Sequence, residues 1–195
     1  MFRYHLYRLS LAKGWAIFSL FLTLQCQAKI YEATDPDLQM ISGVMVHKNQ
    51  LLSGIIRQYI PAVSETHLTT FDNGIQHGDF TVIHDSGVLL QKTPFKNGKQ
   101  NGYSYTWFLN GKNRSFSEFK NGFYVNDRME WHDNGQLALY EKYTPEGKIL
   151  GAKKFYREGK IYMNLVFQED GSSYGLPGSK VCKPIKNSEV NNETN

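Results

Sequence analysis

From residue 71 to residue 171 the chain alternates between short segments rich in aromatic and β-branched side chains and short clusters of glycine, asparagine and aspartate. Residues 103–108, Tyr-Ser-Tyr-Thr-Trp-Phe, are typical of the first kind. Polar and apolar positions follow each other with the two-residue period of a β-strand, and no segment after residue 28 keeps a helical period. The pattern predicts an all-β fold of short strands joined by tight turns.

A second, longer period organises these strands. Phenylalanine or tyrosine occupies positions 71, 95, 119, 143 and 167, each 24 residues after the last, and glycine keeps the same step at 87, 111, 135 and 159. A fixed period of this length is the mark of a repeat array, in which each unit packs on its neighbours. We therefore expect an elongated antiparallel meander of successive β-hairpins that forms a single twisted or curled sheet.

Glycine sets the corners of the predicted hairpins. The dipeptide Asn-Gly, which suits a type I′ turn, occurs at 73–74, 97–98, 110–111, 121–122 and 134–135. Another glycine follows in most units, and Asn126 replaces it in the third, consistent with a position of positive φ. The predicted turn glycines are Gly74, Gly78, Gly87, Gly98, Gly102, Gly111, Gly122, Gly135, Gly147, Gly151 and Gly159.

The repeats weaken toward both ends. Gly54 and the apolar residues 55–60 predict an earlier, atypical unit, with residues 61–64 in place of an Asn-Gly turn. After residue 171 no further unit is completed, and the polar stretch 183–195 predicts a flexible tail. The predicted organisation is a signal peptide at 1–28, a lead-in segment at 29–42, a hairpin-repeat domain at 43–175, and a C-terminal loop and tail at 176–195.

The first 28 residues have the layout of a secretion signal. Three basic residues precede an apolar stretch at 15–24, and Cys26 and Ala28 put small side chains at the positions that a signal peptidase reads. We expect export, with cleavage after Ala28, to the periplasm or outer envelope. Two alternatives stay open: a permanent anchor, although the apolar run is about half the ~20 residues that a membrane span needs, and lipid modification of Cys26.

Loss of residues 1–28 would remove three basic side chains and lower the formal net charge from +4 to +1. The remainder has no block of basic residues, which argues against a nucleic-acid partner. Its turn lysines either keep the sheet soluble or form a strip for lipid headgroups. Cleavage would also leave Cys182 alone, for an intermolecular disulfide or for packing against the sheet end. The lysines in question are Lys96, Lys99, Lys112, Lys120, Lys148, Lys153 and Lys154.

No pattern of catalytic or metal-binding residues stands out. His84-Asp85 and His132-Asp133 occupy equivalent positions two repeats apart, which is four strands or roughly 19 Å, too far to share one zinc ion. His47 and His67 have no cysteine, histidine or carboxylate at metal-ligand spacing. Nucleophile-elbow and phosphate-binding glycine motifs are also missing from the sequence. We expect a protein that is not an enzyme and holds no metal or cofactor.

The middle units carry a resemblance to a known family. Residues 95–112, Phe-Lys-Asn-Gly-Lys-Gln-Asn-Gly-Tyr-Ser-Tyr-Thr-Trp-Phe-Leu-Asn-Gly-Lys, resemble the membrane-occupation-and-recognition-nexus (MORN) repeat, in particular its bacterial antitoxin-repeat variant. The similarity extends over about residues 43–171. It implies an elongated sheet of hairpins that contacts protein or lipid and has no shared catalytic residues. Together with a secretion signal, it suits an envelope immunity protein.

Aromatic positions provide the candidate binding surface. Ile83, Trp107, Trp131 and Phe155 form one column at the repeat step, and Tyr105 and Met129 lie two residues before two of them, on the same face of the pleat. These side chains either pack between sheet layers or form a contact surface, and a single layer leaves its apolar face uncovered. We expect a protein-binding scaffold, with an envelope lipid- or glycan-contacting module as the alternative. The candidate residues are Tyr105, Trp107, Trp131, Phe116 and Tyr140.

Overall fold

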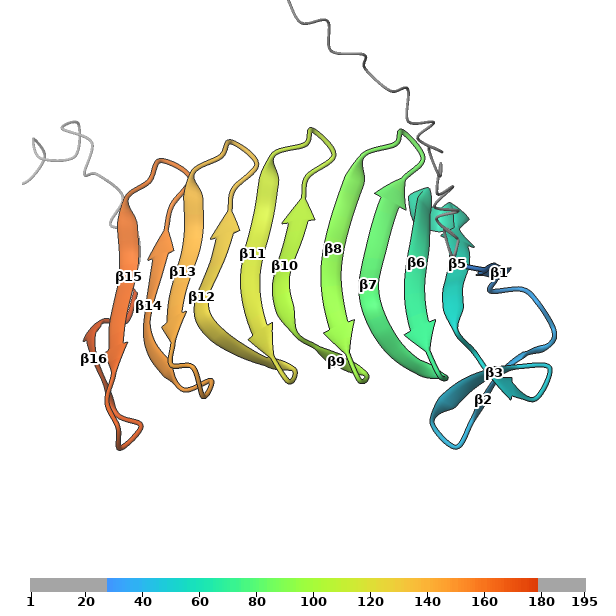
Figure 1. Cartoon of the computed structure of the whole chain (residues 1–195). Coiled ribbons are helices and arrows are strands. Elements are labelled where there is room, and N and C mark those ends of the chain that lie inside the picture. The colour runs from blue at the N-terminus through green and yellow to red at the C-terminus, as the bar shows by residue number, and fades with distance from the viewer. Residues whose placement is uncertain (1–27, 179–195) are drawn as a thin grey trace, which may run out of the picture.

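The protein is described by a computed structural model over residues 28–178, and the predicted all-β hairpin meander is confirmed (Figure 1). A 13-stranded sheet contains consecutive antiparallel strands from β5 to β16. In pairing order these are β5 (Gly54–Ile60), β6 (Glu65–Asp72), β7 (Ile75–His84), β8 (Leu89–Lys96), β10 (Gly102–Trp107), β11 (Asn113–Lys120), β12 (Phe123–Trp131), β13 (Leu137–Tyr143), β14 (Ile149–Phe155), β15 (Ile161–Phe167) and β16 (Ser173–Leu176), with the short β9 (Lys99–Gln100) beside β8.

The N-terminal end of the sheet is irregular. Strand β1 (Ile30–Glu32) pairs in parallel with β5, as the one parallel pair among the described strands. Strands β2 (Leu38–Ile41), β3 (Val44–His47) and β4 (Gln50–Leu51) form a separate three-stranded sheet. The predicted hairpin-repeat domain includes residues 44–51. In the structure these residues lie before Gly54, the first glycine at the 24-residue step, and belong to the small separate sheet. The turn of the early unit is a 3₁₀ helix (Pro61–Val63), where proline sets the first residue.

The Asn-Gly pairs form two different turns. At 73–74, 97–98 and 121–122 both residues have positive φ, as a type I′ turn requires. At 110–111 and 134–135 the type I′ prediction is wrong, because only the glycine has positive φ. In the first of these loops the Asn110 carboxamide accepts a hydrogen bond from the backbone N–H of Lys112, at 3.0 Å, as in an Asx turn.

Loops of the two kinds lie along opposite edges of the sheet. Those joining β7 to β8, β10 to β11 and β12 to β13 lie along the upper edge in Figure 1, and the type I′ turns lie along the lower edge. On the lower edge, the N–H of Gly98 donates to the carbonyl of Gln76 and that of Gly122 to the carbonyl of Gln100, each at 2.8 Å. These bonds reach across to the preceding unit, so they couple neighbouring repeats.

The second glycine of each unit lies inside a strand and not in a turn. Gly54, Gly78 and Gly102 have positive φ, and each lies directly opposite the repeat aromatic of the next strand: Phe71, Phe95 and Phe119. A glycine at this point provides the unusual backbone geometry and leaves space beside the ring. In the third unit Asn126 adopts φ of 56° as predicted, whereas Gly151 lies in β14 without positive φ because the fourth unit has an extra residue before it.

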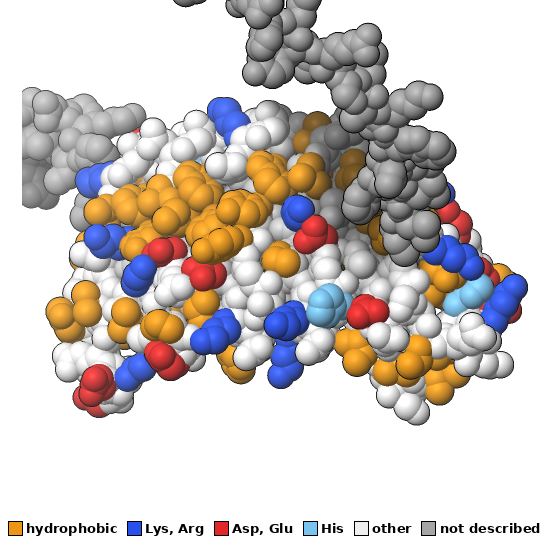
Figure 2. Space-filling model, viewed as in Figure 1, with side chains coloured by type: hydrophobic (Ala, Val, Ile, Leu, Met, Phe, Trp, Pro, Cys, Tyr) orange, Lys and Arg blue, Asp and Glu red, His pale blue; other side chains and the backbone are white. Residues whose placement is uncertain are grey.

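The main sheet is a single layer with two unlike faces. Buried side chains gather on one of them, which we call the small-residue face; its members include Val82, Thr93, Ser104, Ser117, Leu139 and Ala152. The other face is the one seen in Figure 2, where hydrophobic side chains form a band across the upper half of the sheet. Within residues 28–178 no helix is long and apolar enough to span a membrane. The architecture therefore places the candidate aromatic side chains on an open surface.

Candidate binding face

Four neighbouring strands place their apolar side chains in one row on the face seen in Figure 2. Tyr105 of β10 lies directly opposite Phe116 of β11, Phe116 opposite Met129 of β12, and Met129 opposite Tyr140 of β13. Directly opposite residues in antiparallel strands have their side chains on the same face. We call this row, together with Tyr103 and Trp107, the aromatic band.

Ring contacts hold one end of the aromatic band together. The ring centroids of Tyr105 and Phe116 are 5.2 Å apart, those of Tyr103 and Phe116 are 5.9 Å apart, and those of Tyr105 and Trp107 are 5.9 Å apart. These distances are typical of favourable aromatic pairs. Tyr103 is nevertheless 56% exposed and Tyr105 is 38% exposed. The rings contact each other along the sheet, and no second layer in the described structure covers them.

The structure gathers four of the five predicted surface residues, Tyr105, Trp107, Phe116 and Tyr140, into this band. The fifth, Trp131, lies opposite Leu137 at the end of β12, beside a hollow that Gly111 and Lys112 also line. No ring contact joins Trp107 to Trp131 in the described part of the chain, so the two tryptophans do not stack across the hairpins. Tyr103 was missed, although it shares the two-residue spacing of Tyr105 and Trp107.

The same face carries paired charges, with Lys92 directly opposite Tyr105 at the end of the band and Lys142 below it. Lys92 Nζ lies 2.9 Å from a carboxylate oxygen of Asp79, and Lys142 Nζ lies 2.9 Å from Oδ1 of Asp127. The Tyr140 hydroxyl donates to the same Oδ1 at 2.9 Å. The hydrogen bond from Lys142 holds the pKa of Asp127 below its usual value, and the bond to Asp127 raises the pKa of Tyr140. These two lysines are neutralised locally, so the face does not offer them as free cations.

Short side-chain hydrogen bonds link neighbouring strands on the small-residue face. The hydroxyls of Thr93 and Ser104 are 2.7 Å apart, and the Gln91 amide donates to the Thr93 hydroxyl at 3.0 Å. Thr93 is fully buried, which makes its satisfied hydroxyl important for stability.

Charged groups on the small-residue face are also paired. Arg128 donates to Glu141 at 2.6 Å and forms a second ion pair with Glu130. The Tyr143 hydroxyl donates to the same Glu141 carboxylate at 2.9 Å. Burial, together with this bond, raises the pKa of Tyr143 to about 12. This network uses its polar groups internally, unlike the aromatic band.

Among residues 28–178 the histidines do not converge on one site. His84 Nδ1 is 2.8 Å from the Ser86 hydroxyl, and His132 Nε2 is 3.0 Å from the carbonyl oxygen of Phe155, so both serve local structure. His67 Nε2 lies 3.0 Å from a carboxylate oxygen of Glu65, two residues earlier on the same face, and this pair belongs to no group of three potential metal ligands among residues 28–178.

His47 also has a carboxylate neighbour that the sequence spacing did not reveal. Its Nε2 lies 3.2 Å from Asp35, and with Asp37 these residues form the one group of potential metal ligands among residues 28–178. Asp35 also accepts the N–H of Asp37, and Asp37 pairs with Lys48. The twelve-residue separation of His47 from Asp35 spans a folded loop, which is why spacing along the chain missed the contact.

The predictions for the two ends of the chain stay untested. Cleavage after Ala28 depends on residues 1–27, and the role of Cys182 depends on residues 179–195; both ranges lie outside the described residues. No model of a known protein family matches the chain, and no curated protein matches it. The similarity to MORN repeats is therefore a prediction from the residues themselves.

Proposed function

We propose that the protein is a non-enzymatic scaffold that binds another protein through the aromatic band. The observation that carries this proposal is the in-register row of Tyr105, Phe116, Met129 and Tyr140 on an uncovered sheet face. Contiguous apolar surface of this kind is typical of interaction sites, and tyrosine in particular is enriched in them. The aromatic rings are already positioned by mutual contacts, which reduces the entropy lost on binding.

A protein partner explains the charges on this face better than a lipid surface does. Lys92 and Lys142 are both occupied by aspartates, at 2.9 Å in each case. Attraction to anionic lipid depends on unpaired basic side chains, each contributing about 1 kcal/mol near the membrane surface. One further cation, Lys153, lies directly opposite Tyr140 and has no carboxylate ion pair among residues 28–178. An apolar centre with a polar border and few free charges is instead the arrangement of protein interfaces.

The proposed place of action is the cell envelope. The basic, apolar and small-residue pattern of the first 28 residues supports export. The repeat sequence at 95–112 supports a MORN-like or immunity-type scaffold. On this basis the partner is an exported or envelope protein with an exposed apolar surface.

A matched pair of substitutions tests the proposal. Phe116→Ser removes the central ring of the band, while Phe123→Ser removes a phenylalanine that is 67% exposed and lies outside the band. The full chain is expressed in its native cells, captured from detergent-extracted envelope in about 0.5 M salt, and its bound proteins are quantified by mass spectrometry. One protein should be retained by the native chain and the Phe123 variant and reduced at least tenfold with the Phe116 variant.

Two results would contradict this function. A partner retained equally by both variants would place the contact elsewhere. Binding to vesicles containing anionic phosphatidylglycerol, lost as salt rises and unaffected by Phe116→Ser, would favour the lipid-contacting alternative. Far-UV circular dichroism of both variants checks that the sheet is intact.

A further inference from the structure

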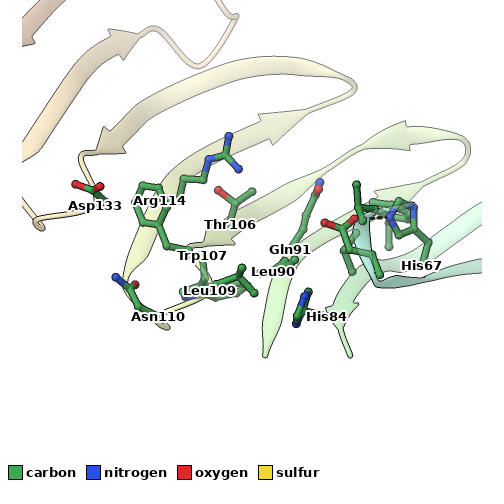
Figure 3. A pocket seen from close by; sticks show the side chains of 15 residues that line it. His67, His84, Leu90, Gln91, Thr106, Trp107, Leu109, Asn110, Arg114 and Asp133 are labelled. Carbon is green, nitrogen blue, oxygen red and sulfur yellow. Dashed lines mark hydrogen bonds and ion pairs between the residues drawn. The ribbon is translucent and has the colours of Figure 1, made fainter. Parts of the chain in front are cut away.

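A groove of about 640 Å³ is lined mainly by residues of the small-residue face, and Trp107 of the aromatic band also lines it (Figure 3). Its volume is in the range of pockets that hold small organic ligands. The groove crosses from β6 to the loop after β10, and its labelled side chains follow in the order His67, Gln91, Thr106 and Arg114. Nothing in the proposed scaffold function uses these residues.

The floor of the groove is a straight row across neighbouring strands. His67 lies opposite Val82, Val82 opposite Gln91, Gln91 opposite Thr106, and Thr106 opposite Ser115. A second hollow of about 410 Å³ continues the row and is lined by several of the same residues. The two spaces together suit an elongated ligand that lies across the strands.

The floor offers uncharged hydrogen-bonding groups. The hydroxyls of Thr106 and Ser115 are 2.7 Å apart. That bond uses one of their two hydroxyl protons, so the pair keeps one donor and several acceptor lone pairs for a ligand. Gln91 adds a carboxamide beside them. A floor of hydroxyl and amide groups matches a polyhydroxylated ligand.

The walls add flat apolar surface. Phe80, Trp107 and Phe108 line the main groove, and Trp131 lines its continuation. A sugar ring presents apolar C–H faces to such rings and hydroxyls at its edge. Aromatic walls above a polar, uncharged floor therefore favour carbohydrate over a purely apolar ligand.

One unpaired cation distinguishes the groove from a neutral sugar site. Of the carboxylates that line the two hollows, Asp133 pairs with Arg157, Glu130 shares Arg128 with Glu141, and Glu65 lies 3.0 Å from His67, which is a cation only when protonated. Arg114 lies over the ring of Phe108, 5.9 Å from its centroid, and has no carboxylate partner among residues 28–178. A guanidinium ion in this position is suited to a carboxylate on the ligand.

We propose that this groove binds an acidic oligosaccharide, with its sugar rings along the aromatic walls, its hydroxyls on Gln91, Thr106 and Ser115, and a uronate carboxylate on Arg114. The groove shares Trp107 with the aromatic band, but its polar floor of Gln91, Thr106 and Ser115 belongs to the opposite face, so the scaffold has one face for a protein and the other for a glycan.

The test is calorimetric titration of the full chain with two probes of equal length, tetragalacturonate and the neutral maltotetraose. Tetragalacturonate should bind with a Kd of about 1 mM or tighter, and maltotetraose at least tenfold more weakly, since a charge-assisted hydrogen bond contributes about 1.5–3 kcal/mol. Arg114→Gln should weaken tetragalacturonate at least tenfold and remove the difference between the probes. Lys153→Gln, which removes the same charge from the other face, should leave both affinities unchanged.

Thr106→Val tests the floor independently of charge and should weaken both probes. Equal binding of the two probes to the native chain, equal effects of Arg114→Gln and Lys153→Gln, or no heat from tetragalacturonate at about 10 mM would each overturn the proposal. Phe116→Ser should leave titration of the groove unchanged, so failure of the protein-binding proposal can be told from failure of this one. A circular dichroism spectrum of each variant verifies folding.

Discussion

The two faces of the sheet are formed by the same strands but differ in how deeply their side chains are buried. On the small-residue face Thr93 is fully buried and hydrogen-bonded to Ser104, whereas on the aromatic face Tyr105 keeps 38% of its surface exposed. Successive residues of a strand point to opposite faces, so the chain can assign the two tasks to alternate positions. The comparison teaches that a single-layer repeat can build its core on one face and leave the apolar side chains of the other face open.

The largest contrast should come from the repeat aromatic on the small-residue face. Phe119 is buried, lies opposite Gly102 and has its ring centroid 4.7 Å from that of Tyr124. Phe119→Ala should lower the free energy of unfolding by about 3 kcal/mol, because the cavity next to the glycine cannot be refilled. Urea denaturation of the full chain measures this loss. A loss below about 1 kcal/mol would show that the small-residue face is not the core.

A smaller effect is expected for the buried hydroxyl pair. Thr93→Val leaves the Ser104 hydroxyl without its buried partner and should cost about 1–2 kcal/mol in the free energy of unfolding. Adding Ser104→Ala to this variant should recover part of the loss, since both polar groups are then gone. A double substitution that costs the full sum of the two single ones would indicate that the hydroxyls do not interact.

Alkaline pH should lower the free energy of unfolding through Tyr143 on the small-residue face. The folded-state pKa of Tyr143 is raised to about 12 from its ordinary value of 10.0. The neutral form is thus favoured by folding, so its contribution is fully present below pH 10 and is lost as pH rises through about 12. Unfolding free energies measured from pH 9 to pH 12 should fall less steeply for Tyr143→Phe than for the native chain. Identical slopes would contradict this role of Tyr143.

The smallest effect on stability should come from the aromatic band. Tyr105→Ser removes ring contacts with Phe116 and Trp107 from a surface that is already open to water. We expect a loss of no more than about 1 kcal/mol in urea denaturation, together with loss of the captured protein. A loss as large as that of Phe119→Ala would make Tyr105 a core residue and remove the distinction between the faces.

Much of the fold could be predicted from the sequence because each unit repeats the same strand-forming and turn-forming residues. The 24-residue aromatic step and the Asn-Gly pairs at 73–74, 97–98 and 121–122 determine strands and turns locally. The turns at 110–111 and 134–135 could not be assigned this way, since Asn-Gly fits two loop types and a side-chain hydrogen bond decides between them. The separate sheet β2–β4 could not be predicted in this way, because its sequence does not recur in the other units.

The candidate site was predictable where alternation alone decides the face. Tyr105, Phe116 and Tyr140 fall on one face because pairing in register continues unbroken through Met129. Trp131 follows a register shift next to Glu130, and such shifts cannot be read from a spacing rule. The groove at Arg114 was also missed, because it is formed by three-dimensional packing of loops that have no common motif.

The most direct test of the central claim compares the two faces in one crosslinking experiment. A photoreactive benzoylphenylalanine replaces Tyr103, which is 56% exposed on the aromatic face, or Lys154, which lies opposite Leu139 on the small-residue face. After irradiation of native cells, mass spectrometry identifies the crosslinked proteins. The account predicts one protein crosslinked from position 103 and not from position 154. A protein crosslinked only from position 154, or equally from both, would contradict it.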